Sequence, residues 1–153
     1  MFAGKVRVRS VGLLVENNRL LLLRHEGIGP LGYLWAPPGG GVEFGQSAEE
    51  TVIREFREET KLEVSIENFL FVNEHRDEKH HAIELFFEVK KVSGTSQLGA
   101  DPEIKTQILS DIGYFSIKEL RQMPALGVHS ILSKIDHLED ALKLRGYYKF
   151  AQF

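Results

Sequence analysis

A proline- and glycine-rich stretch is followed closely by a helix signal in residues 35–60, WAPPGGGVEFGQSAEETVIREFREET. Proline fixes φ and removes a backbone donor, whereas glycine lets another part of the chain approach the backbone closely. Ser47 and Glu50 match a capping box, which predicts a helix over residues 48–60. Apolar residues recur along this helix at helical spacing. The stretch therefore predicts a glycine-rich turn that leads into an amphipathic helix.

Three carboxylates of the predicted helix conflict with its stability. Glu55, Glu58 and Glu59 are spaced i, i+3 and i+4, so they share one helix face. Two carboxylates about 5 Å apart repel each other by roughly 3 kcal/mol at an effective dielectric of about 20. The helix dipole also disfavours anions in the last turn. A local conflict of this kind is expected at a functional site.

A hard cation would reconcile the three carboxylates. Mg²⁺ binds oxygen ligands and retains water, which leaves coordination positions for substrate phosphate oxygens. Such an ion polarises a phosphoryl group and lowers the pKa of an attacking water, and a remaining carboxylate can accept the proton. The ordinary alternative for a run of charges is a solvated helix face. Taken without the glycines, the three glutamates would favour this alternative. The glycines favour the metal site, because their backbone can approach a metal or a phosphate.

The remainder of the chain predicts strands and short helices. Residues 5–16 and 20–23 predict a hairpin around Asn17-Asn18, because asparagine tolerates positive φ. The pattern then predicts strands at 62–66, 69–74, 82–92 and 112–115, loops at 26–34 and 93–102, a short helix at 117–122 and an amphipathic helix from Val128 to Leu142. We expect a single domain over residues 1–153, since no repeat, low-complexity tract or linker interrupts the sequence.

The composition narrows the classes of partner. The 153 residues are 42% hydrophobic with a formal net charge of −3, which is ordinary for a globular protein and offers no basic field for a nucleic-acid backbone. The absence of cysteine excludes disulfides and thiolate metal sites and fits a reducing interior. The sequence shows no signal-peptide stretch and no run of about 18 apolar residues. We therefore expect a cytoplasmic protein with no membrane partner.

Residues 40–62 resemble the signature box of the Nudix hydrolases, which cleave nucleoside diphosphates linked to another moiety. The family pattern is Gly, five residues, Glu, seven residues, then Arg-Glu-hydrophobic-any-Glu-Glu-any-Gly-hydrophobic. The positions that match the box are Gly40, Arg54, Glu55, Phe56, Glu58, Glu59 and Leu62, and the flanking Trp35, Pro38, Gly39 and Glu43 also fit. The resemblance implies an α/β fold, with a mixed β-sheet sandwiched between α-helices.

The resemblance also implies the reaction and its residues. A small-molecule nucleotide of the nucleoside-diphosphate type is expected to lose a phosphoanhydride bond through metal-assisted water attack at phosphorus. Glu55, Glu58 and Glu59 are expected to bind Mg²⁺, or Mn²⁺ in its place, with the Gly40 carbonyl as a further ligand. Arg54 is expected to orient a glutamate, and Glu55 or Glu58 to act as the general base. No other cofactor is implied.

Further positions are expected to contact the substrate or the metal. Gly39, Gly40 and Gly41 are expected at the substrate phosphates. Family members often recruit another acid from a loop after the central strands, and Asp101 and Glu103 lie in such a loop. Acids are common in loops, so an ordinary solvated role for both is the alternative.

Two positions depart from the family pattern. Gln46 stands where the family has Glu, which keeps a hydrogen-bonding oxygen but loses a charge. Lys61 stands where the family has Gly, so it must take a left-handed conformation at a cost of about 1 kcal/mol or end the helix differently. These departures leave the support of Arg54 and the end of the helix as open questions.

Histidines and aromatic residues outside the box have ordinary alternatives. His75, His80 and His81 flank a charged, hairpin-like stretch and could bind a phosphate, but solvated loop residues are the commoner case. The aromatic residues at positions 147–153 suggest a tail that docks on its own domain or across a subunit interface. A homodimer therefore stays open.

Two rival functions remain. The first keeps the fold without the activity: a catalytically weak or silent nucleotide-binding sensor in which Gln46 and Lys61 mark decay. The second is an interaction module whose glutamates are surface charge. Residues 73–81 lack the proline or tyrosine that marks some Nudix subgroups, which weakens ADP-ribose and dinucleoside polyphosphates as substrates. Oxidised or ordinary nucleoside triphosphates and nucleotide sugars remain open.

Overall fold

The structure is a computed structural model that describes residues 4–99 and 108–149. The elements are β1 (Val6–Leu13), β2 (Val15–Glu16), β3 (Arg19–Glu26), β4 (Tyr33–Ala36), β5 (Gly39–Gly41), α1 (Ala48–Thr60), β6 (Glu63–Arg76), β7 (His81–Ser93), β8 (Ile108–Phe115), α2 (Ile117–Arg121), η1 (Ala125–Gly127), η2 (Ser130–Lys134), α3 (Leu138–Ala141) and β9 (Gly146–Tyr148). None of the helices in the described part of the chain is long and apolar enough to cross a membrane.

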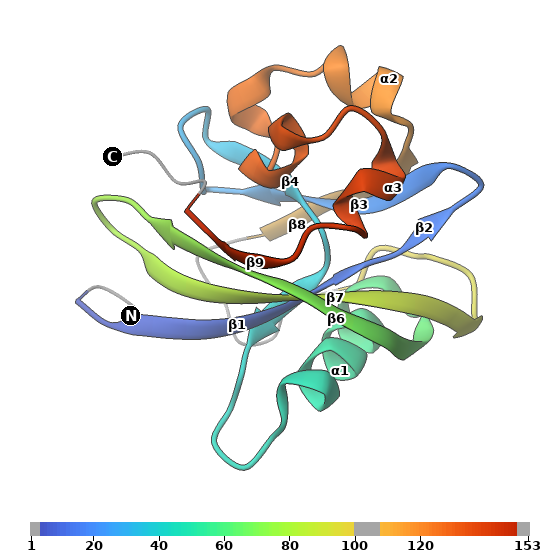
Figure 1. Cartoon of the computed structure of the whole chain (residues 1–153), viewed down its shortest axis with the longest axis horizontal. Coiled ribbons are helices and arrows are strands. Elements are labelled where there is room, and N and C mark those ends of the chain that lie inside the picture. The colour runs from blue at the N-terminus through green and yellow to red at the C-terminus, as the bar shows by residue number, and fades with distance from the viewer. Residues whose placement is uncertain (1–3, 100–107, 150–153) are drawn as a thin grey trace.

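Two β-sheets and the helices around them form the α/β architecture that the sequence predicts (Figure 1). The larger, mixed sheet has the order β5-β1-β7-β6-β9, in which β1 runs parallel to β7 and antiparallel to β5. The smaller sheet has β3 at its centre, paired with β2, β4 and β8. Helix α1 covers one face of the larger sheet, and the short C-terminal helices lie on the opposite side of the molecule (Figure 1).

The predicted N-terminal hairpin is confirmed at its turn only: Val15–Glu16 pair with β3, whereas residues 6–13 of the predicted first strand form β1, which pairs with β5 and β7 in the larger sheet. Asn17 and Asn18 have φ values of 51° and 59°, and Val15 on β2 pairs with Leu20 on β3. A two-residue turn with positive φ at both positions matches the twist of the strands that it joins. Local turn chemistry therefore set this register, as the sequence indicated.

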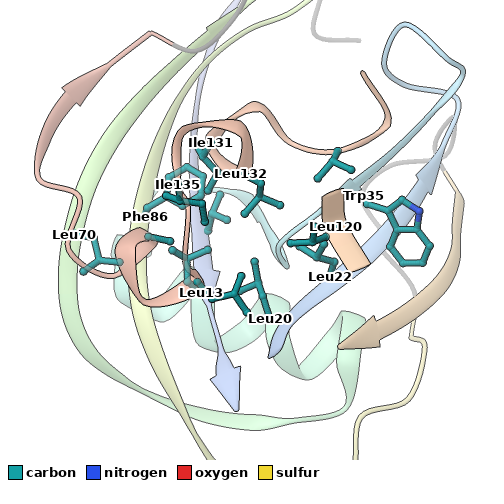
Figure 2. Close-up of a cluster of buried hydrophobic side chains, with 14 of the residues drawn as sticks. Leu13, Leu20, Leu22, Trp35, Leu70, Phe86, Leu120, Ile131, Leu132 and Ile135 are labelled. Atoms are coloured by element: carbon teal, nitrogen blue, oxygen red, sulfur yellow. The ribbon is translucent and has the colours of Figure 1, made fainter. Parts of the chain in front are cut away.

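The core consists of two apolar clusters on opposite faces of the larger sheet. One lies between this sheet, the smaller sheet and the C-terminal helices, where Phe86, Leu22 and Ile131 are fully or almost fully buried (Figure 2). The other lies under α1 and includes Phe56 and Phe87. Neighbouring strand residues point to opposite faces, so strand β7 is covered on both sides, as its mixed pattern indicates.

The prolines and glycines adopt a different structure from the predicted turn. Gly39–Gly41 form an edge strand that pairs antiparallel with β1, with Ser10 opposite Gly40. The three glycines do not appear among the residues with positive φ, whereas Gly45 in the following loop has a φ of 88°. The turn into α1 thus lies at Gly45, and the glycines at 39–41 serve close packing instead.

The predicted long C-terminal helix is wrong. Between Val128 and Leu142 the chain forms η2 and α3, separated by extended backbone at Ile135 and His137. The apolar residues of this segment are nevertheless buried in the first cluster. The apolar spacing therefore predicted correctly which residues are buried. It did not predict a continuous helix, because short helical turns joined by extended residues can bury the same positions.

The C-terminal aromatic segment docks on its own sheet over the residues that the structure describes. Strand β9 pairs parallel with β6, with Tyr148 opposite Asn73. The Tyr148 ring packs edge-on against Phe71 at 5.5 Å, and the Tyr147 hydroxyl donates to Glu74. The first of the two predicted docking modes is thus observed for Tyr147 and Tyr148, while residues 150–153 lie outside the described residues.

Candidate active site

The acidic face of α1 lies against the glycine strand β5. Ser47 caps the helix with Glu50 in a complete capping box, and the helix runs from Ala48 to Thr60 as predicted. Glu55 and Glu59 are fully buried, at 0% exposure, whereas the Glu58 side chain is 30% exposed. The fold therefore divides the three carboxylates into a buried pair and a third group at the solvent boundary.

Two glycines of β5 make this arrangement possible. The Gly39 N–H donates to Glu59 Oε1 over 3.1 Å. A Cβ on Gly40 would lie only 2.2 Å from Glu55 Oε1, so the carboxylate occupies the space that any other side chain would need. A Cβ on Gly39 would lie 2.4 Å from the Ser10 carbonyl oxygen. The close backbone approach predicted from the sequence is therefore confirmed for Gly39 and Gly40.

Arg54 connects the carboxylates to the strand. Its Nη1 lies 3.2 Å from Glu55 Oε1 and 3.5 Å from Glu58 Oε2. Its Nη2 donates to the Gly41 carbonyl over 3.4 Å, and its Nε donates to Gln46 Oε1 over 3.1 Å. Arg54 thus contacts two of the predicted glutamates together, which fits its predicted orienting role.

The two departures from the family pattern leave this geometry intact. Gln46 accepts from Thr51 Oγ1 over 3.1 Å as well as from Arg54, so the amide oxygen does the hydrogen bonding of a carboxylate. Lys61 takes the left-handed conformation at φ 63° and ends the helix by donating to the Arg57 carbonyl over 3.2 Å. The sequence question about the helix end is therefore answered in favour of a strained lysine.

The segment that follows β7 covers the last turn of α1. The Gln97 N–H donates to the Thr60 carbonyl over 2.9 Å, and the Gly99 N–H donates to the Glu59 carbonyl over 2.8 Å. These bonds satisfy carbonyls that a helix end otherwise leaves without partners. The predicted additional acids, Asp101 and Glu103, lie outside the described residues.

The oxygen donors of this site suit a hard cation, although in the described part of the chain they do not form a closed group of three acidic or histidine ligands. Within residues 4–99 and 108–149, no three histidine, aspartate or glutamate side chains are grouped as a metal site. Glu58 is more exposed than the buried pair, and Arg54 contacts both Glu55 and Glu58. Two buried carboxylates beside the side-chain-free backbone at Gly40 nevertheless offer the oxygen donors that Mg²⁺ and Mn²⁺ prefer.

The predicted histidines lie at another end of the molecule. His75 and His80 both contact Asp77, at 3.0 Å and 3.3 Å, and His81 Nε2 lies 2.6 Å from Glu74 Oε2. A surface hollow of about 460 Å³ at this β6–β7 hairpin includes His80 and His81 but no residue of α1. His75 and His81 thus lie on strands rather than in the solvated loop of the ordinary alternative, and all three histidines contact acids of the same hairpin.

A buried polar network was missed by the sequence reasoning. Glu84, only 3% exposed, accepts from Asn73 over 2.9 Å, lies 2.9 Å from His129 Nε2 and pairs with Arg9 at 3.3 Å. Burial alone would raise the pKa of the Glu84 carboxyl, but His129, Arg9 and Asn73 outweigh it and lower the pKa to about 2. The signal was available: a glutamate within a strand covered on both faces must have buried partners.

The sequence and fold of this chain have recognisable relatives. The profile of the NUDIX domain matches residues 6–134. A protein of Methanocaldococcus jannaschii described as an ADP-ribose pyrophosphatase is 34% identical over 92 residues, which covers 59% of this chain and 54% of the relative. The chain thus matches about half the length of that relative.

Solved structures show the same fold. A MutT Nudix hydrolase from Burkholderia pseudomallei has a TM-score of 0.65 at 23% identity, covering 86% of this chain and 98% of that one. A Nudix hydrolase from Nitrosomonas europaea has a TM-score of 0.74 at 20% identity, covering 92% and 93%. The glycine strand and the capped acidic helix therefore define a Nudix-type domain. The chain belongs to the Nudix hydrolase family.

Proposed function

We propose that this chain is a pyrophosphohydrolase that uses Mg²⁺, or Mn²⁺ in its place, to cleave a phosphoanhydride bond in a small nucleoside-diphosphate-type substrate. The observation that carries the proposal is the pair of fully buried carboxylates, Glu55 and Glu59, packed against the backbone of Gly39 and Gly40. Burying two carboxylates together is costly for a helix that has only a structural role. A cytoplasmic location, expected from the cysteine-free sequence, is part of the same proposal.

The residues divide the work according to their exposure. Glu55, Glu58, Glu59 and the Gly40 carbonyl would hold the divalent ion. When bound, the ion neutralises phosphate charge and makes an attacking water more acidic. Arg54, which contacts Glu55 and Glu58, keeps both carboxylates oriented. The Gly39 N–H, which is expected at a substrate phosphate, donates to Glu59 in the structure.

Glu58 is the better candidate for the general base. Glu55 is fully buried, whereas the Glu58 side chain is 30% exposed and can meet a water. In the proposed reaction the water oxygen attacks phosphorus, the bridging P–O bond breaks, and the water's proton passes to the Glu58 carboxylate. The products are a nucleoside monophosphate and the remaining phosphorylated fragment.

A substrate panel tests the proposal. The panel contains ADP-ribose, ordinary and oxidised nucleoside triphosphates and nucleotide sugars, each with Mg²⁺, with Mn²⁺ and with a chelator. ADP-ribose comes first because the Methanocaldococcus relative is described as an ADP-ribose pyrophosphatase. We expect metal-dependent release of a nucleoside monophosphate from at least one class. Nucleotide binding without turnover would select the sensor, and neither binding nor turnover would select the interaction module.

Replacing Glu58 separates catalysis from structure. Glu58→Gln is expected to lower kcat by about 10²- to 10⁴-fold, because the proton acceptor is lost. The thermal midpoint should hold or rise, because one of three clustered negative charges is removed near the helix C-terminus. Glu49→Gln, an exposed residue in the first turn of the same helix, is the matched control and should keep full activity. Unchanged turnover in Glu58→Gln would remove this residue from the mechanism.

A further inference from the structure

Ser10 faces the carboxylate site from the neighbouring strand. It lies on β1 directly opposite Gly40, and residues opposite each other in an antiparallel pair point to the same face of the sheet. The Gly40 Cβ position points at the Glu55 carboxylate, with 2.2 Å to Oε1. Two residues further along β1, the Gly12 Cβ position points at Phe56 on the same helix. The Ser10 side chain therefore points toward α1, beside Glu55.

The Ser10 hydroxyl has no evident structural purpose. Ser10 is fully buried, and its Oγ has no hydrogen-bond partner in the part of the chain that the structure describes. A buried hydroxyl without a partner lowers stability, and native proteins contain few of them. Alanine would fill the same position without this cost, so the hydroxyl points to a ligand or a group that it serves during function.

The neighbouring acceptor on this face is Glu55, which does not bond to Ser10 in the structure and would need a small movement of either side chain to do so. Opposite residues of an antiparallel pair have Cβ atoms about 5 Å apart, and the Glu55 carboxyl lies within 3 Å of the Gly40 Cβ position. A serine hydroxyl rotates freely and donates one hydrogen bond, while an ionised carboxylate accepts at about four sites. Glu55 therefore has capacity for this donor in addition to its contact with Arg54 at 3.2 Å.

We propose that Ser10 is a positioning residue, whose hydroxyl donates to the Glu55 carboxylate when the divalent ion is bound. This inference rests on the metal site of the proposed function. Removing a group that hydrogen-bonds to a metal ligand and orients it typically lowers metal affinity by about 10- to 100-fold. Ser10 needs no contact with the substrate in this role, so its effect should pass through Glu55.

Metal affinity measured without substrate tests the inference. The dissociation constant for Mn²⁺ is determined on the full chain from the electron paramagnetic resonance signal of free Mn²⁺. Ser10→Ala should weaken Mn²⁺ binding about tenfold, while the thermal midpoint of the metal-free protein holds or rises. Ser10→Thr, which keeps the hydroxyl, should bind Mn²⁺ more tightly than Ser10→Ala. Affinity in Ser10→Ala within twofold of the wild type would overturn the inference.

Two double-mutant cycles locate the effect. In a Glu55→Gln background, Ser10→Ala should cause no further loss of Mn²⁺ affinity, whereas in a Glu58→Gln background its full effect should remain. Thr60→Val removes another buried hydroxyl, one that donates to the Phe56 carbonyl, and should lower the thermal midpoint without changing the Mn²⁺ affinity. An undiminished effect of Ser10→Ala in the Glu55→Gln background would contradict the inference.

The cycles also separate this inference from the proposed function. If the wild type binds Mn²⁺ and couples Ser10 to Glu55, but hydrolyses no nucleotide on the panel, the positioning role stands and the proposed activity falls. If the wild type hydrolyses nucleotides and Ser10→Ala leaves the Mn²⁺ affinity unchanged, the activity stands and the positioning role falls. A wild type that binds no Mn²⁺ overturns the positioning role.

Discussion

The narrow space between α1 and β5 decides which residue types can occupy the site. Gly40 could be predicted from the sequence as a close-approach glycine, but the partner that approaches it, Glu55, could not. Ser10 carried no signal at all, since a serine in a strand is unremarkable until its strand partner is known. Contacts between β1, β5 and α1 depend on register, which sequence spacing within one element does not encode.

Replacing Gly40 tests the packing between strand and helix. Gly40→Ala is expected to lower the free energy of unfolding by about 1–3 kcal/mol, because its Cβ would overlap the Glu55 carboxylate and force it to move. Thermal and denaturant unfolding measure the change. Metal affinity should fall in the same variant, because the displaced carboxylate is one of the proposed ligands.

A shorter acid at position 55 should relieve this overlap. In the Gly40→Ala background, Glu55→Asp should recover part of the lost stability, although Glu55→Asp alone gives no such gain. Strict additivity of the two substitutions would show that the Gly40 Cβ does not meet the Glu55 side chain.

At the level of elements, α1 is the part that sequence reasoning predicted best. Its bounds agree with the prediction because the capping box and the apolar stripe are local signals, although the conformation of Lys61 at the helix end was left open. The C-terminal helix failed because its apolar spacing was taken without start or stop signals. The His129 ring accepts from the Ile131 N–H and starts a new short helix there, which breaks the longer one.

The end of α1 offers a stabilising substitution. Lys61 holds a φ of 63°, a conformation that costs a residue with a Cβ about 1 kcal/mol, and glycine adopts it without this cost. Lys61→Gly is therefore expected to raise the free energy of unfolding by roughly 0.5–1 kcal/mol, measured by denaturant unfolding. Lys61→Val is the comparison, since a β-branched residue disfavours this conformation further and should destabilise the protein. A Lys61→Gly protein less stable than the wild type would contradict this account.

For the whole molecule, buried ionisable groups link stability to pH. His25 on β3 is only 8% exposed, and burial, assisted by the positive charge of Arg9, lowers its pKa to about 4 from 6.5. Between these two values the unfolded chain binds a proton that the folded protein does not. Stability from this group is therefore complete above about pH 6.5 and is lost as the pH falls toward 4.

Removing this histidine should flatten the pH dependence. The wild type is expected to lose roughly 3 kcal/mol of unfolding free energy through His25 between pH 6.5 and 4, because the pKa of this group is about 4 in the folded protein and 6.5 in the unfolded chain. His25→Leu should lose less unfolding free energy over the same interval. Denaturant unfolding at steps of half a pH unit measures this loss in both proteins. Parallel curves for the two proteins would assign the loss to other groups. Glu84, whose pKa is lowered from 4.5 to about 2, contributes below about pH 4.5 and therefore overlaps only the lower end of this interval.

The way in which the chain closes its larger sheet bears on how the protein can be handled. Strand β9 covers only Phe71–Asn73 of β6, and it does so with three residues near the C-terminus. A truncation before Gly146 would remove β9 and leave the backbone N–H and C=O groups of β6 at Phe71–Asn73 unpaired. These groups could then pair with a strand of another molecule. Unpaired strand edges promote self-association. Shortened versions should therefore precipitate more readily than the full chain, and purification handles are better placed at the other terminus.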